Sequence, residues 1–144
     1  MEKFSEILND LIIDTGKSLR QIGLETGIPN SQLSRYIRNT IPKIDISLKL
    51  AKYFNCTLDY LFGLSENKGK FIDKYDTSKF ISKYEEALEK CNTTNWKLSH
   101  KCNFSESGYR LWKHGTLPKM ETLIIIAKNL DCSIDYLLGN PDYE

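Results

Sequence analysis

The sequence predicts an all-α chain of two tandem five-helix domains, residues 1–64 and 80–144, joined by a short charged linker at residues 65–79. Three observations support this fold class. Short helical patterns bounded by capping residues recur along the chain. No stretch alternates apolar and polar residues as a half-buried strand does. The stretch Phe4–Gly63 also aligns with Phe80–Gly139 without a gap.

The internal repeat is carried by identities and by one type of exchange. Identical pairs include Ser31/Ser107, Pro42/Pro118, Lys43/Lys119, Asp59/Asp135 and Gly63/Gly139. Glycine and asparagine replace each other in Gly16/Asn92, Gly27/Asn103 and Asn39/Gly115. Both residue types tolerate positive φ. We therefore expect left-handed turns at these positions in both copies, and we interpret the repeat as a duplication.

Each copy is expected to form five short helices, which in the first copy cover about residues 3–14, 18–27, 29–39, 45–54 and 57–63. Ser18 and Gln21 have capping-box spacing, and Gly27 is a typical helix terminator. Pro29 suits the first turn of the third helix. Thr57 is a good cap for the fifth. In the linker, Asp76 or Thr77 is expected to cap the next helix.

Composition excludes several classes of protein. The chain is 40% hydrophobic and 27% charged with a net charge of +1, an ordinary composition. No apolar run could span a membrane, and the polar N-terminus does not resemble a signal peptide. Four cysteines without metal-ligand spacing suggest reduced thiols and a cytoplasmic protein. We expect no enzyme activity, cofactor, metal or small-molecule ligand.

The third helix of the first copy has two unlike faces. At 100° per residue, the inner face holds Leu33, Tyr36 and Ile37, and the outer face holds Asn30, Ser31, Ser34, Arg35 and Arg38. Asparagine can pair with adenine, arginine with guanine and serine with several bases in the major groove. A merely solvated face would look similar, but the preceding short helix and glycine turn favour a DNA-binding role.

Both copies resemble the Cro and phage-repressor type of helix-turn-helix domain, the lambda-repressor-like or XRE-like family. The residues that carry the resemblance are SLRQIGLETGIPNSQLSRYIRN and IPKIDISLKLAKYFNCTLDYLFG in the first copy, and SESGYRLWKHGTLPKMETLIIIAKNLDCSIDYLLG in the second. The resemblance implies a sequence-specific transcriptional regulator that binds double-stranded DNA, commonly as a dimer on two half-sites.

The resemblance also implies which residues contact DNA. Base-reading positions fall on Asn30, Ser31, Gln32 and Arg35, and Ser34 is a further candidate because it lies on the same outer face. Phosphate-contacting positions fall near Ser18 and on Thr40 and Lys43. Lys17, Arg20 and Arg38 are further candidates for phosphate contact because they supply positive charge nearby. Leu19 stands where the family often has glutamine, so backbone N–H groups at this helix start would have to hold the phosphate.

The second copy is a weaker candidate for reading DNA. Glu106 replaces Asn30 and would approach an anionic duplex, and Leu111 replaces Arg35. Ser107, Arg110 and His114 remain candidate DNA contacts. Two readings stay open for this copy: an interaction or dimerisation module, or weak DNA binding.

Two further expectations concern assembly and the core. Apolar residues at the fifth helices suggest a homodimer or an intramolecular pseudo-dimer: Tyr60, Phe62, Leu64, Tyr136 and Leu138. Cys56 and Cys132 are expected to be buried. The competing function is a protein-interaction module, resembling an antitoxin or co-regulator, whose helix-turn-helix units dock a protein partner.

Overall fold

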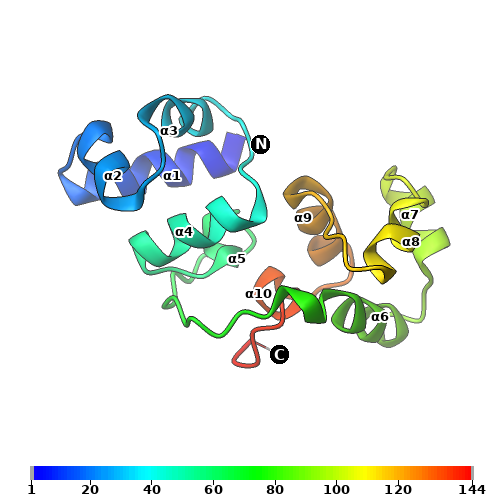
Figure 1. Ribbon diagram of the computed structural model, residues 1–144. Coiled ribbons are helices and arrows are strands. Elements are labelled where there is room, and N and C mark those ends of the chain that lie inside the picture. The colour runs from blue at the N-terminus through cyan, green and yellow to red at the C-terminus, as the bar shows by residue number, and fades with distance from the viewer. Residues whose placement is uncertain (1, 144) are drawn as a thin grey trace. The chain divides into compact units, whose positions relative to one another are not determined.

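A computed structural model describes residues 2–143, and the secondary structure of this part is entirely helical (Figure 1). The chain divides into two compact units, Met1–Phe71 and Ile72–Glu144. The first contains α1 (Glu2–Thr15), α2 (Leu19–Thr26), α3 (Asn30–Ile37), α4 (Ile44–Phe54) and α5 (Leu58–Leu61). The second contains η1 (Thr77–Lys79), α6 (Phe80–Lys90), α7 (Asn95–Cys102), α8 (Gly108–Lys113), α9 (Met120–Asn129) and α10 (Ile134–Leu137). The predicted all-α class is confirmed.

The predicted caps begin and end the helices. The Ser18 hydroxyl accepts a hydrogen bond from the backbone N–H of Gln21 at 3.1 Å, and Gly27 ends α2 with φ 77°. The Thr57 hydroxyl accepts from the N–H of Tyr60 at 3.1 Å. In the second unit the corresponding pairs are Thr94 with Lys97 and Ser133 with Tyr136. These bonds satisfy N–H groups that the helix itself leaves unpaired.

The backbone makes left-handed turns at matching places in the two units. The three predicted pairs all have positive φ, which confirms that expectation: Gly16 and Asn92 (68° and 51°), Gly27 and Asn103 (77° and 58°), Asn39 and Gly115 (105° and 101°). Two further pairs share the property: Asn55 and Asp131 (52° and 50°), Gly63 and Gly139 (78° and 82°). The coincidence supports the interpretation that one unit is a duplicate of the other.

The core of the first unit joins its first and last helices. Helix α1 packs against α3 and α5, and α2 packs against α3 and α4. The rings of Phe4 and Phe62 stack with centroids 4.9 Å apart, and both side chains are fully buried. Burying side chains of this size stabilises a fold by about 1.5–3 kcal/mol each. The α2–turn–α3 segment is thereby attached to a rigid base.

The prediction that five apolar side chains at the fifth helices form an exposed surface is wrong for three of them. Phe62 and Leu138 are 0% exposed and Tyr136 is 6% exposed. Only Tyr60 and Leu64 are half-buried. Phe62 and Leu138 directly follow the four-residue helices α5 and α10 and turn into the core of their own unit. Tyr136 lies within α10, and its hydroxyl donates to Glu86 of α6 at 2.7 Å. The surface that suggested a dimer is therefore mostly occupied within each unit.

The core of the second unit is aromatic. The ring centroids of Phe80, Tyr84 and Trp112 lie 5.6 Å from one another, in one stacked and two edge-to-face contacts. Of the two cysteines expected to be buried, Cys56 is buried and Cys132 is only half-buried. Cys132 follows the left-handed residue Asp131, in a turn that leaves one side of it open to solvent.

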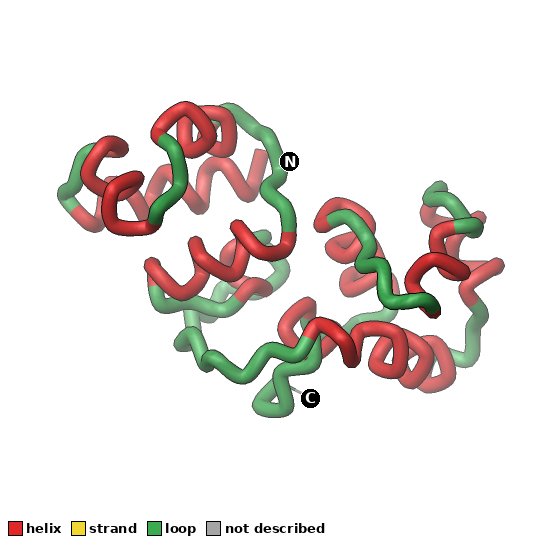
Figure 2. The backbone as a smooth tube through the Cα atoms, viewed as in Figure 1, coloured by secondary structure: helices red, strands yellow, loops and turns green. Residues whose placement is uncertain are grey.

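The segment predicted to be a linker forms hydrogen bonds near both of its ends, each within a single unit. In Figure 2 it runs as a loop from α5 to η1. The N–H of Thr57 donates to the carbonyl of Lys68 at 3.1 Å. In the second unit the N–H of Asp76 donates to the carbonyl of Leu138 at 3.0 Å, and the Asn140 amide donates to the carbonyl of Ile72 at 2.8 Å. The side chain of Asp76 also accepts from the N–H of Ser78 and caps η1.

Candidate nucleic-acid interface

The turn between α2 and α3 is set by two glycines. Gly27 supplies the left-handed residue, and Ile28 anchors the turn in the core. Gly23 lies inside α2, where a Cβ would stand 2.9 Å from the carbonyl oxygen of Ile28. A side chain there would push α2 away from the turn. Sequence reasoning missed Gly23, although a glycine inside a helical pattern is a recognised sign of close packing.

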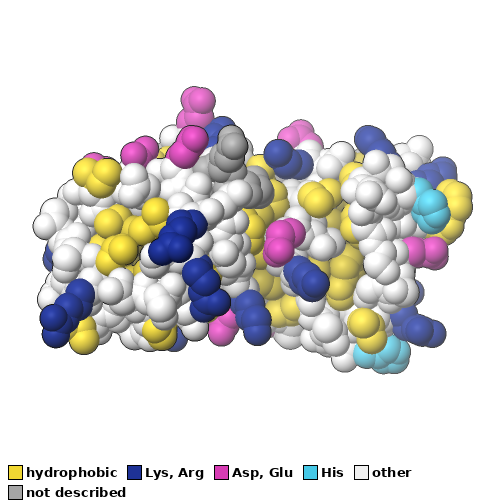
Figure 3. Space-filling model, turned by 90° about the horizontal axis from the view of Figure 1, so that it is seen from above, with side chains coloured by type: hydrophobic (Ala, Val, Ile, Leu, Met, Phe, Trp, Pro, Cys, Tyr) yellow, Lys and Arg dark blue, Asp and Glu magenta, His cyan; other side chains and the backbone are white. Residues whose placement is uncertain are grey.

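Helix α3 presents the predicted outer face to solvent. Leu33 and Tyr36 are buried, and this side attaches the helix to α1 and α2. Asn30, Ser31 and Arg35 are exposed. The helix sequence NSQLSRYI contains no acid. Figure 3 looks down on the α2 and α3 side of the first unit and shows lysine and arginine side chains on this face, with acidic side chains mainly towards its edges.

Three other predicted contacts on or near α3 already have partners within the unit. The Tyr36 hydroxyl donates to Oε1 of Gln32 at 3.4 Å. An Arg38 guanidinium nitrogen donates to the Ser34 hydroxyl at 3.1 Å. Gln32 and Ser34 are half-buried, whereas Arg38 is exposed and follows the end of α3. These bonds orient the side chains, but they also reduce what Gln32 and Ser34 offer to a base edge.

Lys17 is paired with an acid that sequence reasoning overlooked. Its ammonium lies 2.7 Å from Oε1 of Glu25. Glu25 also accepts hydrogen bonds from Gln21 at 2.6 Å and from the Tyr53 hydroxyl at 2.8 Å. These bonds, led by the one from Lys17, lower the pKa of Glu25 to about 2. A phosphate would therefore have to compete with Glu25 for Lys17.

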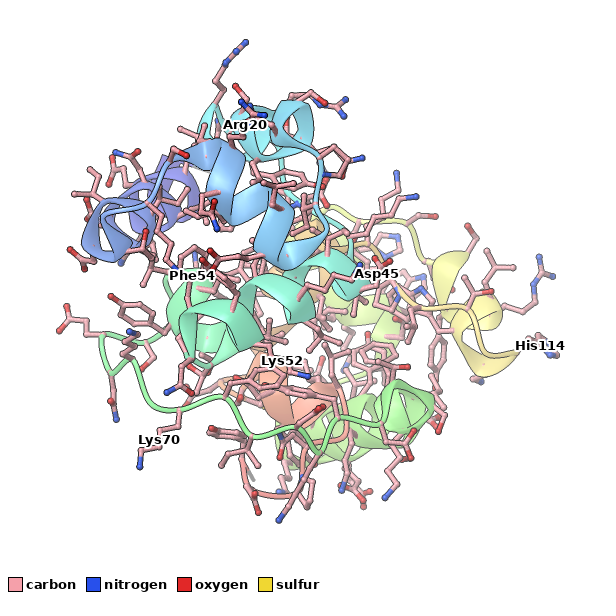
Figure 4. All side chains as sticks on the ribbon, turned by 60° about the vertical axis from the view of Figure 1, so that its left-hand side comes forward. Arg20, Asp45, Lys52, Phe54, Lys70 and His114 are labelled. Carbon is pink, nitrogen blue, oxygen red and sulfur yellow. The ribbon has the colours of Figure 1, made fainter. Side chains whose placement is uncertain are left out.

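The remaining predicted phosphate contacts lie at the starts of α2 and α4. Ser18 caps α2 through its side chain and Arg20 is exposed on the outside of α2 (Figure 4). Thr40 is exposed in the segment after α3. Lys43 is exposed at the start of α4, and its side chain makes no capping bond. Arg20 and Lys43 are thus exposed cations that form no ion pair among the described residues.

The second unit has a shorter counterpart of α3. Helix α8 begins at Gly108, so Glu106 and Ser107 lie in the turn before it. By the repeat, the corresponding residues of the first unit are the first two of α3. Glycine inside a helix costs about 1 kcal/mol relative to alanine, which favours this late start. The Ser107 hydroxyl is bonded to that of Ser105 at 2.7 Å.

The exposed side of α8 is mixed in character. Arg110 is exposed, and His114 is exposed just after the helix (Figure 4). Leu111, at the position of Arg35, is 54% exposed. Trp112 is buried, whereas Tyr109 is half-buried and its hydroxyl donates to Glu85 at 2.6 Å. The face therefore lacks the run of short polar side chains found on α3.

No group of three or more histidine, cysteine, aspartate or glutamate side chains in the described residues lies within reach of a shared metal ion. Among the described helices, none combines the length and the apolar character needed to cross a bilayer.

Comparison with known proteins gives one match. Residues 12–61 match a family model described as helix-turn-helix, whose members are DNA-binding, non-enzymatic domains. No curated protein and no solved structure matches the chain. The matched residues begin in α1 and end with α5, so they include the capped α2, the glycine turn and the polar face of α3. Residues 12–61 of the first unit are therefore similar to helix-turn-helix domains of the Cro/C1 type.

Proposed function

We propose that the chain is a transcriptional regulator that reads double-stranded DNA through the first unit, with α3 in the major groove. The acid-free, exposed face of α3 carries this proposal. Asn30 can make two hydrogen bonds to adenine, and Arg35 can make two to guanine. Both side chains are exposed, and both stand on a helix whose other side is buried. A rigid helix aims such groups better than a loop does.

The proposed phosphate contacts flank the reading helix. Arg20 on α2 and Lys43 at the start of α4 supply cations, and Ser18 marks a helix start whose N–H groups favour an anion. Thr40 adds an exposed hydroxyl after α3. Contacts of this kind position the protein on the duplex without reading its sequence. Ser31 at the start of α3 would then face the base edges beside Asn30.

Selection from random duplexes tests this proposal. The full chain is incubated with random double-stranded DNA, and the bound fraction is amplified and sequenced. We expect a short enriched site whose binding weakens steeply as salt rises, because phosphate contacts release counterions. The Asn30→Ala/Arg35→Ala variant should lose the enrichment and keep salt-sensitive binding. Selection without any enriched site would reject the proposal.

A further inference from the structure

The second unit contains a cleft that lies between its first helices and the turn before α8. The cleft has a volume of about 550 Å³. Its walls come from the C-terminal half of α6, the first residues of α7 and the start of α8. The acidic members of the lining are Glu85, Glu89 and Glu106, and the aromatic members are Trp96 and Tyr109.

The charge of this surface is opposite to that of the corresponding surface in the first unit. Three glutamates and neither lysine nor arginine line the cleft. At the corresponding positions of the repeat, the first unit has Lys17, Arg20 and Asn30 and no acid, and Lys17 is paired with Glu25 of α2. Glu89 and Glu106 are exposed and make no ion pair among the described residues. A duplex would be repelled where the first unit attracts it, and a cation would be attracted.

A buried amide provides a second, independent sign of a ligand. Asn95 lines the cleft and is 5% exposed. Its Oδ1 accepts from the Tyr84 hydroxyl at 2.6 Å, and no hydrogen bond joins its Nδ2 to any described residue. No fully enclosed side-chain nitrogen or oxygen in the described residues lacks a partner. The Nδ2 atom is therefore not fully enclosed, and Asn95 is one of the residues that line the cleft.

Trp96 adds a stacking surface. Its side chain is 56% exposed at the start of α7, beside the cleft, and one side of its ring packs near His100 with centroids 4.2 Å apart. A guanidinium stacks on an indole ring and forms forked hydrogen bonds with carboxylates. A lysine ammonium would be attracted to the same carboxylates, but it is not planar and cannot both stack on the ring and form a forked pair of hydrogen bonds.

We propose that this cleft binds an arginine-bearing segment of a protein partner. The guanidinium lies between Trp96 and the carboxylates of Glu89 and Glu106, and its aliphatic stem lies against Leu88 and Tyr109. The Nδ2 of Asn95 donates to a backbone carbonyl of the same segment. In this proposal the second unit is an adaptor that docks a protein through the surface that corresponds, by the repeat, to the start of α2 and α3 in the first unit. This assignment does not depend on the first unit reading DNA.

A titration of the isotope-labelled full chain tests the proposal by nuclear magnetic resonance. The probe is the blocked tripeptide acetyl-Gly-Arg-Gly-amide, and its control is the same peptide with neutral citrulline in place of arginine. We expect the arginine peptide at millimolar concentration to shift the amide signals of Glu89, Asn95 and Glu106 and the indole signal of Trp96. The citrulline peptide should leave these signals in place.

Variants identify the groups that bind. The double variant Glu89→Gln/Glu106→Gln should bind the arginine peptide about fivefold or more weakly, because two exposed ion pairs are lost. Trp96→Ala should lower the affinity for the arginine peptide about twofold to fivefold, because the stacking surface is lost. The control Glu121→Gln removes an exposed carboxylate from α9, outside the cleft, and should change nothing. Dispersed amide signals show that each variant is folded.

Four outcomes would overturn the proposal. They are no shift of the amide signals with either peptide, and equal shifts with both peptides. The other two are a loss of peptide affinity in Glu121→Gln equal to that in Glu89→Gln/Glu106→Gln, and shifts scattered over acidic residues outside the cleft. A random DNA duplex provides one further comparison. If the duplex shifts the signals of Glu89, Asn95 and Glu106 where the arginine peptide does not, the cleft belongs to a nucleic-acid interface and the docking proposal is rejected.

Discussion

At the scale of single residues, the side chains on and beside α3 have unlike chemical roles. Asn30 and Arg35 are exposed hydrogen-bonding groups on a helix that is fixed by Leu33 and Tyr36. Lys43 is an exposed cation outside that helix. Groups that meet base edges affect sequence preference, whereas groups that meet phosphates affect affinity for every sequence alike. This difference makes the proposed roles separable by single substitutions.

Arg35→Ala tests base reading. The change should cost about 1–3 kcal/mol of binding to the selected site and relax the preference at one base pair, since a bidentate guanine contact is lost. Gel shifts on the site and its single-base variants measure both effects. Lys49→Ala, an exposed charge on α4, is the control. Equal losses on all duplexes would show that Arg35 contacts phosphate instead.

Lys43→Ala tests the proposed contact with a DNA phosphate. Affinity should fall by a similar factor for selected and random duplexes, and the slope of log affinity against log salt should flatten by about one phosphate contact. Affinity measured across a salt series gives this slope. A change in base preference with an unchanged slope would contradict the assignment.

Glu25 predicts a pH dependence of stability. Its pKa is lowered from the ordinary value of 4.5 to about 2, mainly by the hydrogen bond from Lys17. A carboxyl group whose pKa is lower in the folded state than in the unfolded state stabilises the fold at pH values above the unfolded-state pKa. For Glu25 this stabilisation is lost as the pH falls from about 4.5 towards 2. Urea unfolding over this range should therefore show a shallower pH dependence for Glu25→Gln. Glu6→Gln, at an exposed position on α1, should retain the slope of the unaltered protein.

At the scale of elements, the close approach of α2 to its turn sets how α3 is presented. Gly23 permits the approach because a Cβ there would lie 2.9 Å from a backbone oxygen, which cannot move aside as a flexible side chain can. Gly27 permits the turn itself through its positive φ. One glycine is required by packing and the other by backbone conformation, so they should respond differently to substitution.

Gly23→Ala should lower the free energy of unfolding by about 1–3 kcal/mol, because the added methyl group forces α2 and the turn apart. Urea unfolding followed by circular dichroism measures the change. Gly27→Asn is the matched control. Asparagine tolerates positive φ and stands at the corresponding position, Asn103, in the second unit. A Cβ at position 27 would also lie in open space, so the loss in free energy of unfolding should be small. A stable Gly23→Ala variant would contradict the packing argument.

At the scale of the whole molecule, two units of similar backbone present unlike surfaces. The left-handed residues recur at the same five places in both. The surface around the start of α3 has basic and neutral side chains, whereas the corresponding surface of the second unit has three glutamates around a cleft. These surfaces suggest one unit that reads DNA and one that docks protein.

Substitutions in the second unit test this division. Glu106→Ala should leave affinity for DNA unchanged or raise it, because a carboxylate near the duplex is removed. Arg110→Ala should cause at most a small loss that is equal for all sequences. Selection from random duplexes with each variant measures the base preference. If either variant shifts that preference as much as Arg35→Ala does, both units read sequence and the operator should contain two unlike half-sites.

Much of the local structure was determined by the sequence alone. The caps Ser18 and Thr57, the left-handed glycines and asparagines, and the polar face of α3 all follow from short-range chemistry, which acts within a few residues along the chain. The helical class and the sides of α3 that face inward and outward were therefore predictable. The region matched to the helix-turn-helix family agrees with the resemblance inferred for the first copy.

Other features were decided only by tertiary packing. The burial of Phe62 depends on Phe4, which lies far from it in the sequence, and the pairing of Lys17 depends on Glu25 and Tyr53 from other elements. The late start of α8 and the cleft beside Asn95 likewise arise where α6, α7 and α8 meet. Periodicity places a side chain on a face, but it does not say which distant group meets that face. That choice follows from the way the chain folds back on itself, because burial and ion pairing depend on distances in space.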